Sequence, residues 1–392
     1  MKSLVALLSI PFLLAGCATP PPTLTAQDAE PLLQDRRFAA PVRTIAADEV
    51  FALSPQMKRY IEADMAPHLR AQGHREGLID ALYSRGRLKL RYDAARTRNA
   101  AEAFDGRAGN CLSLVIMTAA FAKALEVPVH YQSVMVDAEW SRSGNLYLTS
   151  GHVNIALGQR LIDRAGVVTS APELLTVDFL PQEDTGGRRT QVISESMIVA
   201  MYMNNRAVEA LTAGEVDDAY WFVREAVLKE PRFLAAFNTL GVIYQRRGLV
   251  REAEPVFARV LQIEPENRHA LANMARLLAG EGRQAEAEAL QSRLAQIEPH
   301  PPYHFFDLGL AAMKEGRFAD AKALFTREIR RAAYQHEFHF WLGVANYKLG
   351  DTRQASRHIA QAVDHSTTQE YHDLYAAKLQ WLKAQQQRQR LQ

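Results

Sequence analysis

The sequence predicts an α+β domain followed by an all-α repeat solenoid. Two patterns point to this division. Between about residues 88 and 167, an apolar helical segment is followed by segments in which apolar and polar residues alternate, as in an antiparallel sheet. Over residues 197–366, glycines and other small residues recur every 34 residues, which is typical of stacked helix pairs. A chain of 392 residues is long enough for about two or three domains.

Residues 1–17 have the character of an export signal. Lys2 supplies a positive charge, and residues 4–14 form an apolar run too short to span a bilayer. The following run Leu14-Ala15-Gly16-Cys17 resembles a bacterial lipoprotein signal, which implies cleavage before Cys17 and attachment of lipid to its thiol. With Ala18 next, this resemblance favours the cell envelope, on the periplasmic face of the outer membrane. A plain secretory signal or a short anchor is the alternative.

Residues 18–47 contain five prolines among scattered polar residues, which predicts a flexible tether from the membrane to the folded body. The whole chain has 48% apolar and 23% charged residues, an ordinary soluble composition. Its net charge is +2, with both signs interspersed along the sequence. This distribution argues against a dedicated surface for nucleic acid or for anionic lipid.

Residues 48–190 are expected to form the α+β domain. Its first helix is expected to begin at Ser54-Pro55, a capping residue followed by proline at the first helical position. Residues 88–92 alternate over too short a run to decide between strand and helix. Further helices are expected over residues 75–83, 97–104 and 111–125, and strands from residue 129 through residues 161–163 and over residues 174–180.

Cys111 stands at the predicted start of the 111–125 helix. The free backbone N–H groups and the positive end of the helix dipole favour a thiolate at such a position. If Cys17 carries lipid, Cys111 is the one remaining cysteine of an exported protein and has no disulfide partner. It is then either a buried, inert thiol or a nucleophile. The preceding Asn110 is expected to cap the helix rather than to orient a group beside the thiolate.

Several independent series of residues recur along the repeats. In each unit, small residues allow two helices to pack closely and a glycine turns the chain between them. Proline ends the second helix of the first three units. The pattern resembles the tetratricopeptide repeat, and it predicts five units over residues 197–366 and a capping helix with a tail over residues 367–392. The glycine series is Gly214, Gly248, Gly282, Gly316 and Gly350, and an alanine series follows at Ala219, Ala253, Ala287, Ala321 and Ala355.

Cysteine-dependent amide chemistry needs a thiolate, an imidazole that moves its proton, and a third group that orients the imidazole. Cys111, His152 and Asp163 supply these groups in order, the first on a helix and the others on neighbouring strands. Inward side chains on such strands can come within hydrogen-bond reach. Gln132 is either an oxyanion stabiliser or a strand surface residue.

Short segments around these residues resemble the transglutaminase-like superfamily. The resemblance covers about residues 88–167, and it implies a papain-like layout in which Cys111 is the nucleophile, His152 the base and acid, and Asp163 the orienting carboxylate. The segments that carry it are Arg107-Ala108-Gly109-Asn110-Cys111, Leu125-Glu126-Val127-Pro128, Gly151-His152-Val153-Asn154 and Leu161-Ile162-Asp163.

Two functional hypotheses follow. In the first, a lipid-anchored envelope enzyme attacks a peptide-type amide through Cys111, forms a thioester, and releases it to water or to an amine, while the repeats recruit a protein or peptide partner. In the second, the transglutaminase-like domain is inert and the repeats assemble envelope proteins. No metal-ligand spacing or phosphate-binding loop occurs in the sequence, so we expect no metal or cofactor, and the repeat aromatics fall on core positions rather than on a nucleic-acid surface.

Overall fold

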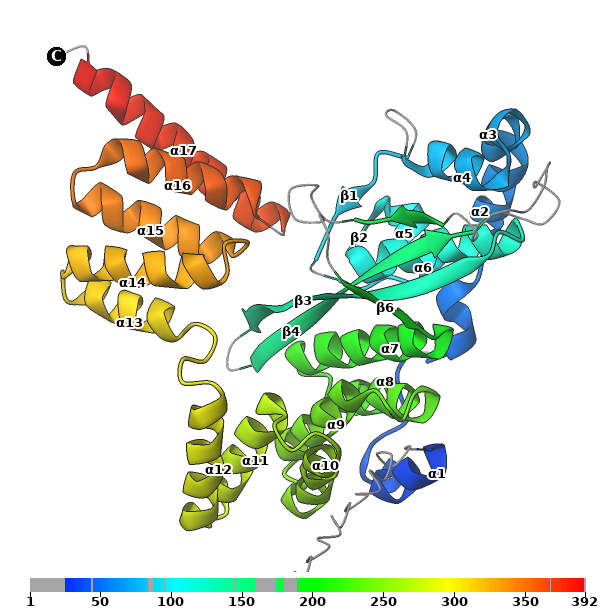
Figure 1. The fold of residues 1–392 in the computed structure, drawn as a ribbon, viewed down its shortest axis with the longest axis horizontal. Coiled ribbons are helices and arrows are strands. Elements are labelled where there is room, and N and C mark those ends of the chain that lie inside the picture. The colour runs from blue at the N-terminus through cyan, green and yellow to red at the C-terminus, as the bar shows by residue number, and fades with distance from the viewer. Residues whose placement is uncertain are drawn as a thin grey trace, which may run out of the picture.

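The computed structural model describes residues 25–43, 45–83, 88–94, 96–143, 146–158, 174–179, 189–366 and 368–390. Two of the candidate site residues, Cys17 and Asp163, lie outside these ranges, as does the strand expected over residues 161–163. The chain forms an N-terminal α+β domain and five helix pairs that lead into a long C-terminal helix (Figure 1).

The α+β domain begins with short helices. Helix α2 (Pro55–Tyr60) starts as expected, because the side chain of Ser54 accepts a hydrogen bond from the Met57 N–H at 3.2 Å. The ambiguous run near residue 90 contains a short strand, β1 (Arg91–Tyr92), that pairs in parallel with β2 (Ala108–Gly109). The other helices are α1 (Ala26–Ala29), η1 (Glu30–Leu32), η2 (Asp35–Arg37), η3 (Ala47–Phe51), η4 (Ile61–Met65), α3 (Ala66–Gln72), α4 (His74–Tyr83) and α5 (Ala100–Gly106).

Helix α6 (Cys111–Ala124) forms the centre of this domain, and residues 111–122 are all buried. It packs beside an antiparallel sheet with the strand order β5-β4-β3-β6 (Figure 1). A helix that is apolar on all sides is stable only when other elements surround it. The strands are β3 (Val129–Ser143), β4 (Leu146–Leu157), β5 (Leu175–Val177) and β6 (Thr190–Ile193).

Strands β3 and β4 pair in a register that places Val134 opposite His152 and Gln132 opposite Asn154. Directly opposed residues of an antiparallel pair project from the same face, and residues two apart share that face. His152 and Asn154 therefore extend from one face of β4, next to Gln132 and Val134 of β3. The antiparallel arrangement expected from residue 129 onward is confirmed for these strands.

Five helix pairs follow the sheet. Each inter-helix glycine of the 34-residue series has a positive φ, between 75° and 82°, which is favourable only for glycine. A second glycine class permits close packing: a Cβ on Gly241 would lie 2.4 Å from the ring of Phe257. The pairs are α7 (Glu195–Thr212) with α8 (Val216–Lys229), α9 (Leu234–Arg247) with α10 (Val250–Ile263), α11 (Arg268–Gly280) with α12 (Gln284–Ile297), α13 (His304–Lys314) with α14 (Phe318–Arg331), and α15 (His336–Lys348) with α16 (Thr352–Asp364).

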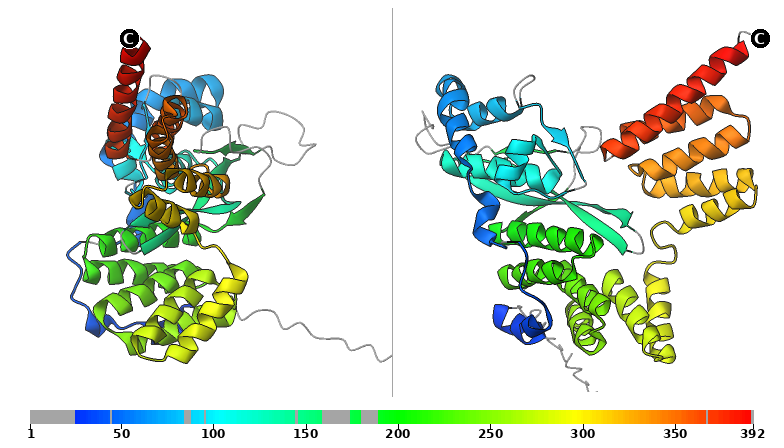
Figure 2. Two further views of the ribbon diagram at one scale, coloured as in Figure 1. Left: turned by 90° about the vertical axis from the view of Figure 1, so that its left-hand side faces the viewer. Right: turned by 180° about the vertical axis from the view of Figure 1, so that it is seen from behind.

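The helix pairs do not share one continuous core. The buried core that includes α6 and the sheet continues through α11 and ends at Ala287 of α12. A separate core begins at Tyr303 and spans α13 to α15, and a third joins α16 to α17 (Gln369–Arg390). The chain crosses from α12 to α13 through a loop of bends and turns (Figure 1, Figure 2). The 34-residue period of the sequence continues through this loop, so it did not predict the break between the two cores.

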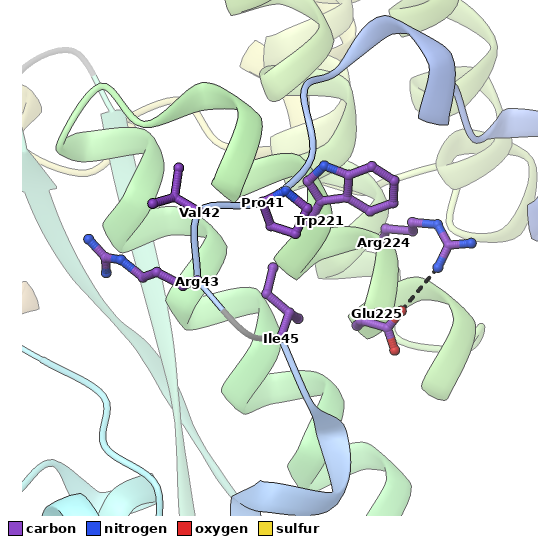
Figure 3. Close-up of a pocket in the computed structure, with 7 residues that line it drawn as sticks. All are labelled: Pro41, Val42, Arg43, Ile45, Trp221, Arg224 and Glu225. Carbon is purple, nitrogen blue, oxygen red and sulfur yellow. Dashed lines mark hydrogen bonds and ion pairs between the residues drawn. The ribbon is translucent and has the colours of Figure 1, made fainter.

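Residues 25–43 differ from the flexible tether expected there, because they lie along α8 to α10 (Figure 2). The ring of Phe38 stacks on Tyr220 with centroids 3.9 Å apart, and the Arg224 guanidinium donates to the Asp35 carboxylate at 3.0 Å. The indole N–H of Trp221 donates to the Ala39 carbonyl. A hollow of about 430 Å³ adjoins these contacts. Its lining includes Pro41, Ile45 and Trp221 (Figure 3). Buried aromatic contacts and satisfied polar groups account for this order.

Gly241→Ala should destabilise the protein by about 1–3 kcal/mol, because the new methyl group would overlap a fully buried phenylalanine ring. Gly280→Ala is the matched control, since a Cβ there would meet nothing within 4 Å. It should leave stability unchanged or raise it by about 0.5–1 kcal/mol. Thermal unfolding measures both. Equal melting temperatures for the two variants would contradict the close helix contact at Gly241.

Candidate active site

Cys111 is the first residue of α6. Asn110 before it has extended backbone angles, and its side-chain oxygen accepts from the Ser113 N–H at 2.9 Å, which confirms the expected helix cap. Gly109 is needed on the entering strand, because a Cβ there would lie 2.6 Å from the Cβ of Ser113. Cys111 forms no disulfide and is 6% exposed. Its thiol is therefore buried at the end of the helix where the first backbone N–H groups have no partner within the helix.

His152 on β4 is 4% exposed and joins this thiol to a carboxylate. Its Nε2 lies 2.7 Å from Oδ1 of Asp178. The side chain of Cys111 also interacts with the imidazole and favours its charged form. Because Nε2 faces the carboxylate, Nδ1 is the nitrogen left for the sulfur. The structure therefore brings two of the sequence-predicted residues, Cys111 and His152, into contact.

Asp178 was not predicted from the sequence. It directly follows β5, which pairs with β4 so that Val177 lies opposite Ile155. The second carboxylate oxygen is 3.4 Å from the side-chain nitrogen of Asn154, two residues beyond His152 on the same face. A strand was expected over residues 174–180, but one sequence gives no sign of which strand borders β4. Asp163, the expected orienting residue, lies outside the described ranges, and its role stays a prediction.

The surroundings of His152 favour its charged form. Burial lowers the pKa of the imidazole, but hydrogen bonds and charge interactions with Asp178 and Cys111 outweigh that effect and raise the pKa to about 9. The ring is thus an imidazolium at neutral pH. The Cys111 sulfur therefore lies beside a buried cation, at the N-terminus of α6. The carboxylate fixes which ring nitrogen faces the sulfur.

Gln132 lies across from Asn154, on the same sheet face as His152, and is half-buried. This position is compatible with either of its expected roles. Within the part of the chain that the structure describes, no group of three or more His, Cys, Asp or Glu side chains could hold a metal ion.

Asp178→Asn should lower the pKa of His152 from about 9, because the variant loses the negative charge that favours the imidazolium and keeps only a neutral amide oxygen as acceptor. Histidine ring NMR across pH 5 to 10 measures this shift, and a His152→Gln spectrum assigns the resonance. A pKa that stays near 9 in Asp178→Asn would contradict the assigned pair.

The raised pKa of His152 also makes the stability of the folded protein depend on pH. An unfolded histidine titrates near 6.5, below the folded value, so the native state binds the proton more tightly. The stabilisation from this group is complete below about pH 6.5 and is lost as the pH rises to about 9. The loss between these two values should be smaller in Asp178→Asn.

Comparisons with known proteins identify the repeats. A family model described as tetratricopeptide repeat matches residues 244–304, and another with the same description matches residues 306–373. No curated protein matches the chain by sequence. Both family matches lie after the α+β domain.

Several solved repeat proteins are similar to part of this chain. PilF of Pseudomonas aeruginosa is 19% identical, with a TM-score of 0.29, and the match covers 48% of this chain and 86% of that one. MamA from Desulfovibrio magneticus RS-1 is 18% identical, with a TM-score of 0.26 and coverage of 45% and 98%. A thermophilic repeat protein of Thermus thermophilus is 16% identical, with a TM-score of 0.29 and coverage of 46% and 98%. Likenesses at this level bring no function to the chain. The family matches confirm the sequence prediction that its C-terminal half contains tetratricopeptide repeats.

Proposed function

We propose that this protein binds a protein or peptide partner through its repeats and that Cys111 reacts with an amide of that partner. Tetratricopeptide repeats are present, and such arrays offer extended surfaces for peptide or protein ligands. This part of the proposal has the support of the family matches. The chemical part is supported by one observation, the contact of Cys111 with a His152 that also binds Asp178.

The proposed reaction is acyl transfer through a thioester. The Cys111 sulfur attacks the carbonyl carbon of an amide, and backbone N–H groups at the start of α6 stabilise the oxyanion. As the C–N bond breaks, the His152 imidazolium gives its proton to the leaving amine. Water or a second amine then attacks the thioester, His152 accepts the proton of that nucleophile, and the sulfur leaves. Water gives a hydrolase and an amine gives a transferase.

Two carboxylates are candidates for the residue that orients His152 in this proposal. The resemblance to the transglutaminase-like superfamily assigns it to Asp163, with a papain-like layout for the domain. The hydrogen bond from His152 supports Asp178. Comparing Asp163→Asn with Asp178→Asn separates the two, because only the orienting residue should change the titration of His152.

We also propose attachment to the envelope through lipid on Cys17, with the protein on the periplasmic face of the outer membrane. The support is the sequence resemblance of residues 14–17 to a lipoprotein signal. Among the residues that the structure describes, no helix is both long and apolar enough to cross a bilayer. Metabolic labelling with a palmitate analogue tests the attachment, with Cys17→Ala as the control.

Iodoacetamide should alkylate Cys111 at pH 6 about tenfold faster or more in the wild type than in His152→Ala, because the imidazolium stabilises the thiolate. The two rates should converge above about pH 9, where His152 loses its charge. Mass spectrometry of the Cys111 peptide gives the rates independently of Cys17. If His152→Ala reacts as fast as the wild type at pH 6, catalysis through this pair is excluded.

The second candidate function is an assembly scaffold with an inert α+β domain, which the family matches favour because both lie in the repeats. Envelope pull-downs with Cys111→Ser and Cys111→Ala distinguish the two functions. A scaffold should retain the same partners in both variants and in the wild type. An enzyme should enrich its substrate on at least one inactive variant relative to wild type, because the substrate is no longer converted. Identical recovery in all three proteins would favour the scaffold.

A further inference from the structure

Thr97 connects the start of helix α6 with the first repeat helix, α7. It lies in the loop between β1 and α5 and is 2% exposed. Its hydroxyl, its N–H and its carbonyl all take part in hydrogen bonds with residues far away in the sequence. A buried loop residue bonded through all three groups has little freedom to move independently of its partners.

On one side, Thr97 holds the helix cap beside Cys111. Its hydroxyl oxygen accepts from the Asn110 side-chain nitrogen at 3.0 Å. The other end of that amide caps α6 by accepting from the N–H of Ser113 at 2.9 Å and from its hydroxyl at 2.8 Å. Arg98, the next loop residue, donates its N–H to the Ser113 hydroxyl at 2.8 Å. The residue before the thiol is thus held by its own helix and by this loop.

On the other side, three residues of α7 hold Thr97. The Glu209 carboxylate accepts from the Thr97 N–H at 2.6 Å, and the Arg206 guanidinium donates to its carbonyl at 3.2 Å. The side-chain nitrogen of Asn205 donates to the Thr97 hydroxyl oxygen at 3.2 Å, so this oxygen serves both Asn110 and Asn205. Arg206 also pairs with Glu209 at 3.1 Å, which fixes both charges against the loop.

We propose that Thr97 and Asn205 are positioning residues for Cys111, so that the first repeat helix sets the orientation of the thiol. This inference rests on the proposed function for its catalytic meaning. Neither residue takes part in the contact among Cys111, His152 and Asp178; each acts through the amide of Asn110. A change in α7 shifts Thr97, the shift reaches Asn110, and the adjacent sulfur moves relative to His152. Such an arrangement couples the state of the repeats to the thiol, and the coupling is reciprocal.

The test uses the full chain with three substitutions. Thr97→Val removes the shared hydroxyl at nearly constant volume, Thr97→Ser keeps it, and Asn205→Ala removes the donor on α7. Asn204→Ala is the matched control, because this neighbouring asparagine is also on α7, is 9% exposed, and has a side-chain oxygen without a hydrogen-bond partner in the described structure. Melting temperatures first establish that each variant folds.

Thr97→Val and Asn205→Ala should slow the alkylation of Cys111 at pH 6 by about three- to tenfold, which corresponds to about 0.7–1.4 kcal/mol, a size typical of one hydrogen bond. Thr97→Ser and Asn204→Ala should keep the wild-type rate. A purely structural role would lower the melting temperatures and leave this rate unchanged in the folded variants, and that result would overturn the proposal.

Hydrogen exchange separates this proposal from the proposed function. Backbone amides of residues 111–114 should exchange faster in Thr97→Val than in Thr97→Ser, whether or not Cys111 is reactive. If the wild-type thiol shows no dependence on His152 but exchange still changes, the chemistry fails and the positioning stands. If exchange at the start of α6 is the same in both Thr97 variants, positioning through Thr97 is wrong.

Discussion

The buried imidazole of His152 imposes the strongest physical constraint on the N-terminal domain. A charged ring that is 4% exposed is stable only when its burial is offset, and here the carboxylate of Asp178 and the side chain of Cys111 offset it. The ring reaches both partners only if β4 lies between β5, which Asp178 follows, and the start of α6, where Cys111 lies. The sheet order β5-β4-β3-β6 and the buried helix α6 meet this requirement.

The repeats extend this arrangement beyond the α+β domain. Helix α7 contributes residues to the loop at Thr97, and the core around α6 continues without interruption into the first three helix pairs. The N-terminal segment adds a second contact, since Phe38 and Asp35 bind residues of α8. The first repeats are therefore structurally part of the domain that holds the thiol. The last two pairs lie outside this core: α13 to α15 share a second core, and α16 forms a third with α17.

The two parts of the solenoid differ in how a bound partner could influence the thiol. Residues 25–43 already cover part of the surface formed by α8 to α10, and their aromatic and carboxylate contacts hold them there. At the other end of the solenoid, α17 packs against α16 and contacts His336 of α15. A partner bound near α7 would act on the loop at Thr97, whereas one bound at α13 to α16 would be separated from it by the break after α12.

The sequence by itself determined the repeats and the capped helix at Cys111, and a family resemblance pointed to His152. Glycine turns, helix caps and alternating strands are local patterns, and their physical causes lie within a few residues of each other. Tertiary structure alone decided that Asp178 meets His152, because the order of strands in a sheet depends on pairing between distant segments. It also decided the break after α12 and the docking of residues 25–43. Both depend on side-chain packing over long separations, which a repeat period or a proline-rich composition does not encode.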